Sequence, residues 1–302
     1  MSLDCWVLVT TEGWGGALTV ARAVGRVTAV VVGPRDLADQ VAAAGPEEVR
    51  WVQPDVGVPE EAYASALAEQ VSAAAPRMLI AASDPASRVL IGAAAARIRA
   101  CLVPGVTSVT ADGTTLLVQR SAIGGETIET VATDGPVAAI YAGEDVPVPA
   151  TAPASPVTVL QLAPVAMTVL ASDPIATATG LADAPRVVSF GRGVKARDDV
   201  ELMRQLADAL DAELACSMPV ADDLGWLEKE RYVGRSGNHI TPNLYLAVGI
   251  AGAPQHMEGV RGARVIAAIN SDPDARVFLT ADYGIVGDLY QVVPELIKAV
   301  NK

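Results

Sequence analysis

Four segments in the last third of the sequence carry residue types that could hold a nucleotide. They are rich in glycine or small polar residues, and they span residues 189–195, 233–238, 250–256 and 270–274. Glycine lets backbone N–H groups approach a ligand closely, and the N-terminus of a helix adds partial positive charge for a phosphate. Any one of these segments is also what an ordinary strand-to-helix turn requires. Four of them in one domain favour a nucleotide-binding site.

The standard signatures of nucleotide sites and hydrolases are absent. Gly191 and Gly193 begin a dinucleotide-like turn, but the third glycine of that fingerprint is missing, and the chain has no GxxxxGK[ST] loop. Ser236 lies in GRSGN, which has the wrong spacing for a nucleophile elbow, and no acid–base couple accompanies it. His256 is a lone imidazole, for which a structural role in the core is the simpler interpretation from the residues alone. The pattern predicts that backbone groups, hydroxyls and one cation bind a nucleotide cofactor, with no catalytic residue.

The composition excludes a disordered chain and makes nucleic-acid binding unfavourable. Of the 302 residues, 51% are hydrophobic and 19% are charged, which provides enough apolar surface for two cores. With only 4 Trp, 6 Tyr and 2 Phe, the cores must consist of aliphatic side chains, as suits helices packed on parallel strands. The formal net charge of −13 repels phosphate backbones.

Cysteine spacing bears on metal binding and on the redox state of the thiols, and hydropathy bears on membrane insertion. Cys5, Cys101 and Cys216 share no metal-binding spacing and the chain has 2 His, so we expect no metal site and reduced thiols. The start of the chain has no basic region of a secretory signal. The uncharged stretch over residues 146–172 could span a bilayer by length, but its prolines prevent a continuous helix. These features predict a cytoplasmic protein that does not insert into a membrane.

Alternating apolar runs and helical patterns predict an α/β fold with two domains. In the first, residues 1–145, we expect helices over 60–75 and 86–100 and strands over 6–10, 27–32 and 78–82. Shorter strands punctuated by Thr and Gly follow, and they predict antiparallel hairpins that close the sheet, over 106–110, 115–120, 127–130 and 137–141. This domain is therefore predicted to be a Rossmann-like α/β layer with an antiparallel extension.

Residues 146–185 are predicted to form a proline-rich linker or edge segment, and residues 186–302 a second domain. Its expected elements are strands over 186–189, 244–250, 264–270 and 277–280, and helices over 198–210 and 294–300. We expect Pro254 and Pro294 each in the first turn of a helix, where proline is tolerated. Strands alternating with helices predict a doubly wound parallel sheet, in which ligands lie outside the carboxyl ends of the strands.

Three motifs of this second domain resemble the alpha subunit of electron transfer flavoproteins. They are NLYLAVGIAGAPQH over residues 243–256, AAINSDPD over 267–274 and ADYGIVGDL over 281–289. The resemblance runs continuously from about residue 186 to the end, and over residues 1–145 it rests on the order of elements. In that family an alpha and a beta subunit form a heterodimer, and the C-terminal domain of alpha binds most of an FAD.

The resemblance implies that particular residues contact this FAD. Arg192 would contact the pyrophosphate, Ser236 would face the flavin in place of the family's threonine, and His256 would approach the pyrimidine edge of the ring. A donor there favours negative charge on the flavin. The other positions that the resemblance assigns to the cofactor are Ser217, Val233, Gly234, Arg235, Ala251, Gly252, Ala253, Pro254 and Gln255, and, at the adenosine end, Asn270, Asp288 and Leu289.

The sequence departs from the family pattern beside the flavin. Met218 stands where the family usually has arginine, Arg235 where glutamine is usual, Asn238 where lysine is usual and Ala251 where serine is usual. These changes predict retained FAD binding with altered redox tuning. They indicate a specialised paralogue serving one dehydrogenase or carrier system, for which a mycofactocin system is one candidate.

The function that the resemblance implies is electron transfer without a substrate conversion of its own. A dehydrogenase would reduce the FAD, and a quinone-linked or other redox acceptor would reoxidise it, with the N-terminal domain facing the beta subunit. Two alternatives remain open from the sequence. One is a subunit of a bifurcating or NAD-linked flavoprotein enzyme, and the other is a non-redox assembly partner that has lost FAD.

Overall fold

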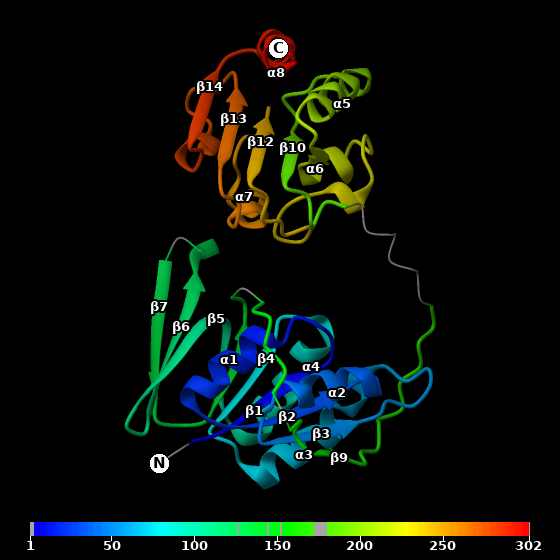
Figure 1. Ribbon diagram of the computed structural model, residues 1–302, viewed down its shortest axis with the longest axis vertical. Helices are drawn as coiled ribbons and strands as arrows, with labels where there is room; N and C mark the ends of the chain where they lie inside the picture. Colours follow the sequence, from blue (N-terminus) through cyan, green and yellow to red (C-terminus); the bar gives the residue numbers. More distant parts are fainter. Residues whose placement is uncertain (1–2, 126, 144, 152, 172–179, 302) are drawn as a thin grey trace. The chain divides into compact units, whose positions relative to one another are not determined.

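The computed structural model describes residues 3–125, 127–143, 145–151, 153–171 and 180–301. The chain divides into two units, Met1–Ser172 and Asp173–Lys302, and each unit contains its own sheet with helices on both faces (Figure 1). The expected α/β class with two sheets is confirmed. In the described part of the chain, no helix is long and apolar enough to cross a bilayer.

The N-terminal unit is built on a mixed sheet with the strand order β7-β6-β5-β8-β4-β1-β2-β3-β9. Its strands are β1 (Leu3–Val9), β2 (Gly25–Val32), β3 (Glu48–Val52), β4 (Met78–Ala82), β5 (Cys101–Asp112), β6 (Thr115–Ala122), β7 (Thr127–Thr133), β8 (Val137–Tyr141) and β9 (Val157–Val159). Its helices are α1 (Gly15–Val24), α2 (Arg35–Ala43), α3 (Ala64–Ala74) and α4 (Pro85–Ile98), with short 3-10 turns over Glu60–Tyr63 and Ile123–Gly125.

Alternation along the buried strands produces two cores, one on each face of this sheet. Val7 on β1 packs with Leu18 on α1 and Val41 on α2, whereas Leu8 packs with the α3 and α4 side chains on the opposite face. Because both faces of β1, β2 and β4 are covered, the buried residues of these strands are almost all apolar, as in parallel strands between helices.

The prediction that residues 137–141 belong to an antiparallel hairpin is wrong. The strands β5, β6 and β7 do form an antiparallel meander, but β8 lies between β4 and β5 and is parallel to both. The sequence of β8, VAAIY, is apolar at every position and almost fully buried. That pattern belongs to a central strand covered on both faces, and it outweighs the strand's position after a hairpin.

The C-terminal unit is built on a parallel sheet with the order β11-β10-β12-β13-β14. Its strands are β10 (Arg186–Phe190), β11 (Glu213–Cys216), β12 (Leu244–Val248), β13 (Ile266–Asn270) and β14 (Tyr283–Val286). Its helices are α5 (Val200–Ala209), α6 (Met218–Ala221), α7 (Pro254–Met257) and α8 (Leu289–Val300), with 3-10 turns over Arg197–Asp199, Lys229–Arg231, Glu258–Val260 and Arg276–Leu279. Helices α5 and α8 cover one face, and α7 lies on the other (Figure 1).

Two expected elements of this unit are wrong. Residues 276–279 form a 3-10 turn rather than a strand, because the N–H of Val277 donates to the carbonyl of Ala251 and holds the segment against the loop after β12. The edge strand is instead β14. Helix α8 begins at Leu289, where the Asp288 carboxylate accepts a hydrogen bond from the N–H of Tyr290 at 3.0 Å, so Pro294 lies inside the helix. Pro254 does occupy the first turn of α7, as predicted.

Candidate functional site

The strand order of the C-terminal sheet places its topological switch point between β10 and β12. The chain passes from β10 to β11 on one side and then crosses to β12 on the other, so the loops after β10 and β12 diverge. Ligands of open α/β sheets bind in the crevice that such diverging loops form outside the carboxyl ends of the strands. Two of the candidate nucleotide-binding segments, residues 189–195 and 250–256, begin at this switch point.

Two glycines allow the diverging loops to approach each other at the switch point. The N–H of Gly193 donates to the carbonyl of Gly249 at 3.0 Å, and a Cβ added to Gly193 would lie 2.6 Å from the Cα of Gly249. Gly249 has a φ of +61°, in the left-handed region that favours glycine. A side chain at either position would therefore push the two loops apart.

The loop after β12 is held by its neighbours on β13 and on the turn that follows it. The side-chain amide of Asn270 donates to the carbonyl of Ile250 at 2.9 Å, and the N–H of Val277 donates to the carbonyl of Ala251 at 3.1 Å. Gly252 has a φ of +79° and turns the chain toward α7. Ala251, Ala253 and Gln255 remain exposed along this loop, whereas Gly252 is buried.

The structure brings the segment over residues 233–238 to the same edge, although it does not directly follow a strand. The N–H of Val233 donates to the carbonyl of Cys216, the last residue of β11, at 3.0 Å. The N–H of Arg235 donates to the carbonyl of Gln255 at 2.7 Å. Tertiary hydrogen bonds therefore join the loops of β11, β12 and residues 233–238 into one surface.

The polar side chains on this surface differ in whether they form ion pairs or hydrogen bonds within the protein. Arg192 is exposed, and no described residue forms an ion pair or side-chain hydrogen bond with it. Arg235 donates from Nε to the Glu258 carboxylate at 2.7 Å, so a neighbouring negative charge offsets its positive charge. The hydroxyl of Ser236 lies 3.0 Å from that of Tyr232. Arg192 is thus the cation best placed to meet an anionic ligand.

Ser217 and Met218 follow β11 at this edge. Ser217 precedes the short helix α6, where its N–H donates to the carbonyl of Phe190 at 3.0 Å, and its side chain caps no N–H of that helix. Met218 is 42% exposed, an unusual position for a large apolar side chain.

The residues assigned to an adenosine end lie at the carboxyl ends of β13 and β14. Besides holding Ile250, Asn270 accepts a hydrogen bond from the N–H of Asp272 at 3.0 Å through Oδ1. Asp288 caps α8, and Leu289 is buried in the core beneath that helix. These contacts fix the shape of the edge between β13 and α8.

His256 lies on the face of the sheet covered by α7 and is 7% exposed. Its Nε2 is 2.6 Å from the hydroxyl of Tyr245 on β12, while Nδ1 is buried and makes no hydrogen bond with the described residues. Burial lowers the pKa of His256 to about 4, and the backbone of Val233 opposes this shift. The structure therefore holds a neutral imidazole with one unengaged nitrogen.

A pH-dependent loss of stability follows from this burial. The folded-state pKa of His256 lies near 4 and the unfolded value near 6.5, so the unfolded chain binds more protons between these values. The contribution of neutral His256 to the free energy of unfolding is fully present above about pH 6.5. The free energy of unfolding should fall by up to about 3 kcal/mol as the pH drops toward 4. Urea denaturation of the wild-type chain and of His256→Gln measures this difference. The His239→Gln variant, changed at an exposed histidine, should retain the wild-type pH dependence. If the free energy of unfolding of His256→Gln still fell with pH as in the wild type, burial of His256 would not be the cause.

Tyr245 and Glu258 contact the predicted site residues but were not singled out in the sequence. Tyr245 lies within the continuous apolar run LYLAV of β12 and therefore resembles any core strand residue. Glu258 follows His256 by two positions, and its opposite charge to Arg235 is the signal that could have indicated their pairing.

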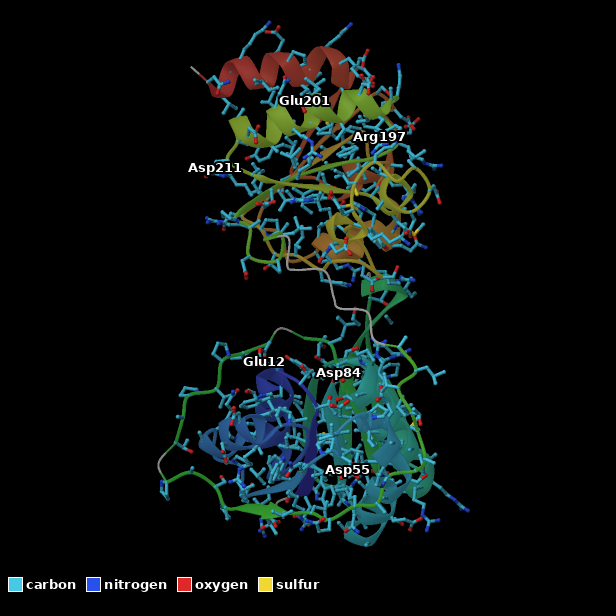
Figure 2. The ribbon with its side chains drawn as sticks, turned by 90° about the vertical axis from the view of Figure 1, so that its right-hand side faces the viewer. Glu12, Asp55, Asp84, Arg197, Glu201 and Asp211 are labelled. Atoms are coloured by element: carbon cyan, nitrogen blue, oxygen red, sulfur yellow. The ribbon has the colours of Figure 1, made fainter. Side chains whose placement is uncertain are left out.

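Two other regions of the described structure carry polar groups but suit an anionic ligand less well than this edge. A cavity of about 440 Å³ lies at the amino ends of β10 and β11; its lining includes the carboxylates of Asp183, Asp208, Asp211 and Glu213, which disfavour an anionic ligand. Figure 2 shows Asp211 and Arg197 at opposite ends of α5, so this cavity is at the opposite edge from the loop after β10.

The N-terminal sheet has a switch point of its own between β1 and β4. There, Thr10 donates to the Asp84 carboxylate at 2.8 Å and lies 2.9 Å from the hydroxyl of Ser87. Figure 2 shows Asp84 in this unit, at the start of α4. These polar groups gather around a carboxylate whose Oδ2 is buried without a partner among the described residues, so they offer no cation to a phosphate.

Comparison with known proteins identifies the family. A family model described as "Electron transfer flavoprotein domain" matches residues 9–167, and one described as "Electron transfer flavoprotein FAD-binding domain" matches residues 180–261. The chain is 36% identical over 249 residues to the "Putative electron transfer flavoprotein subunit YdiR" of Escherichia coli strain K12, covering 80% of each protein. It is 51% identical over 116 residues to "Protein FixB" of E. coli O139:H28, covering 38% of this chain and 37% of FixB.

The residues of the C-terminal unit fit the FAD that this family binds. A dinucleotide needs close backbone approach at its diphosphate, a cation beside it, and polar atoms that its rings can engage. The glycines at the switch point, the unpaired Arg192 and the unengaged Nδ1 of His256 provide these three features. The family also implies a beta subunit as partner. Model matches over both units and a relative aligned across most of its length show that this chain is an alpha-type subunit of the electron transfer flavoprotein family, which binds FAD and acts in electron transfer.

Proposed function

We propose that FAD is held at the carboxyl edge of the C-terminal sheet, within a domain formed by residues 186–302. The observation that carries this proposal is the convergence of the loops after β10, β11 and β12 with residues 233–238 on one edge, which also bears an unpaired arginine. The residues proposed to contact FAD are Arg192, Ser217, Val233, Gly234, Arg235, Ser236, Ala251, Gly252, Ala253, Pro254, Gln255, His256, Asn270, Asp288 and Leu289.

The side chains of this edge suit different parts of the cofactor. Arg192 would pair with the diphosphate, to which a guanidinium fork presents two parallel donors. Small residues along the loop after β12 would let the isoalloxazine lie close to the backbone, while Ser236 and His256 would offer polar atoms to its edge. When bound, FAD supplies the chemistry of accepting and releasing electrons, and the protein supplies binding, orientation and electrostatics.

The proposed physiological role is transfer of electrons from a dehydrogenase to a quinone-linked or other redox acceptor, in a heterodimer with the beta subunit. Residues 1–145 would face that subunit, and residues 146–185 would connect the two domains. Met218 and the Arg235–Glu258 pair distinguish this flavin environment from the usual family pattern and support dedication to one dehydrogenase system. In this proposal the chain is an electron carrier without a substrate conversion of its own.

Replacement of Arg192 by alanine tests the placement of the diphosphate. Loss of a bidentate, charge-assisted contact should weaken FAD binding by about 1.5–3 kcal/mol. Isothermal titration of FAD into the FAD-depleted alpha–beta complex measures this change. Arg204→Ala is the matched control, because Arg204 is an exposed arginine on α5 of the same unit. Equal FAD affinities in the two variants would show that the diphosphate lies elsewhere.

A further inference from the structure

Two buried polar residues of the sheet lie next to His256, in the core under α7. The hydroxyl of Tyr245 lies 2.6 Å from Nε2 of His256, and both residues are buried. Ser189 on β10 is 0% exposed, and its Oγ faces Tyr245 without reaching hydrogen-bond geometry. Polar groups so deeply buried in an aliphatic core are costly unless they serve each other or a ligand.

The direction of the hydrogen bond between Tyr245 and His256 follows from what each atom can do. Burial raises the pKa of Tyr245, so its phenol keeps its proton. The one hydrogen bond that this buried hydroxyl makes with the described residues is to Nε2 of His256. A buried hydroxyl that did not donate to that acceptor would leave its proton unsatisfied. With Tyr245 as the donor, Nε2 is the unprotonated nitrogen, and a neutral imidazole carries its proton on Nδ1.

The groups around this pair leave the imidazole neutral. The backbone of Val233, in the loop at residues 233–238, favours the charged form, but burial has the larger effect and lowers the pKa of His256 to about 4. The titratable group facing Tyr245 from β11 is Cys216, and burial raises the pKa of its thiol to about 12, so it stays uncharged. Glu258, on the turn that follows α7, forms an ion pair with Arg235 of the loop at residues 233–238.

We propose that Tyr245 is a positioning residue that fixes the tautomer of His256, so that Nδ1–H is a donor reserved for an acceptor atom of the bound cofactor. Ser189 supports this arrangement by facing the Tyr245 oxygen from β10. The proposal rests on the proposed FAD site, since that site supplies the acceptor. It assigns to Tyr245 a role toward the cofactor without contact between them.

The tautomer of His256 can be measured directly in the alpha–beta complex with FAD bound. Nitrogen NMR of ring-¹⁵N histidine distinguishes the two neutral tautomers, and the signal absent from His256→Gln identifies His256. At pH 7 the wild-type protein should carry the proton on Nδ1. In Tyr245→Phe, which keeps the aromatic ring, the Nδ1–H to Nε2–H ratio should fall about tenfold, as expected for one lost hydrogen bond. Tyr283→Phe, at an exposed tyrosine on β14, should leave the ratio unchanged.

The outcomes separate this proposal from the proposed function. A proton on Nε2 in the wild-type protein, or an unchanged ratio in Tyr245→Phe, would overturn the positioning role even if the visible spectrum shows bound FAD. The absence of FAD from the complex at saturating cofactor would instead refute the proposed site. If Tyr245→Phe does not fold, the wild-type tautomer alone decides the proposal.

Discussion

Replacing Gly252 with alanine is expected to destabilise the C-terminal unit by about 3–5 kcal/mol, since it combines a left-handed backbone with steric overlap. Gly252 has a φ of +79°, and a Cβ there would lie 2.1 Å from the backbone nitrogen of Val277. That nitrogen donates to the carbonyl of Ala251, so the turn over residues 276–279 cannot move away without breaking the bond that holds the loop. FAD binding should weaken with stability, because the same loop carries proposed contact residues.

A second glycine of the same unit provides the matched control. Gly225 also has a positive φ, +60°, but a Cβ there would meet nothing within 4 Å. Gly225→Ala should therefore cost only the backbone strain, about 1–2 kcal/mol. Hydrogen exchange of β12 and β13 amides in a urea series measures both free energies of unfolding in the complex. Equal losses would mean that the loop after β12 is not held against residues 276–279.

Replacing Met218 with arginine is expected to raise the reduction potential of the bound FAD. Under the proposed arrangement Met218 lies beside the flavin, and a cation at that distance stabilises negative charge on the reduced ring. A unit charge at about 4 Å in a partly wet site contributes about 1–4 kcal/mol, or about 40–170 mV for one electron. Potentiometric titration of the complex measures the shift. Met218→Gln, which is polar but uncharged, should leave the potential close to the wild-type value.

Arg235 could instead supply the charge that Met218 lacks, and the structure bears on this alternative. Its guanidinium is paired with Glu258 at 2.7 Å, so the pair as a whole contributes little positive charge. We therefore expect Met218→Arg to act on the potential even with Arg235 in place. A large drop in Arg235→Gln together with a small rise in Met218→Arg would show that Arg235 compensates. If neither variant shifts the potential, neither position faces the flavin.

The sequence predicted those parts of the fold that depend on local pattern. The predicted ranges of β4 and β8 coincide with the structure, because both are short apolar runs bounded by turn residues. The position of β8 in the sheet could not be predicted, since strand order depends on contacts between distant segments. The strand β11 was not predicted: its four residues, ELAC, mix charge with apolar side chains and carry little periodicity. The start of α8 depended on the capping carboxylate of Asp288, which outweighed Pro294.

The location of the candidate site followed from topology, but its internal contacts did not. Loops after parallel strands must share one edge, so the segments after β10, β12 and β13, rich in glycine or small polar residues, could be assigned to it from the sequence. Residues 233–238 reach that edge only through backbone hydrogen bonds to Cys216 and Gln255, which no sequence pattern encodes. The contact between Tyr245 and His256 likewise forms because α7 packs on the face of the sheet opposite α5 and α8.

Hydrogen–deuterium exchange of the alpha–beta complex, with and without FAD, tests the central claim most directly. If FAD lies at the carboxyl edge of the C-terminal sheet, its addition should slow exchange at the amides of residues 191–195, 233–238 and 251–256. The switch point of the N-terminal unit around Thr10 and Asp84 should exchange at the same rate in both states. Protection confined to that N-terminal switch point, with unchanged exchange at the three C-terminal loops, would contradict the proposed site.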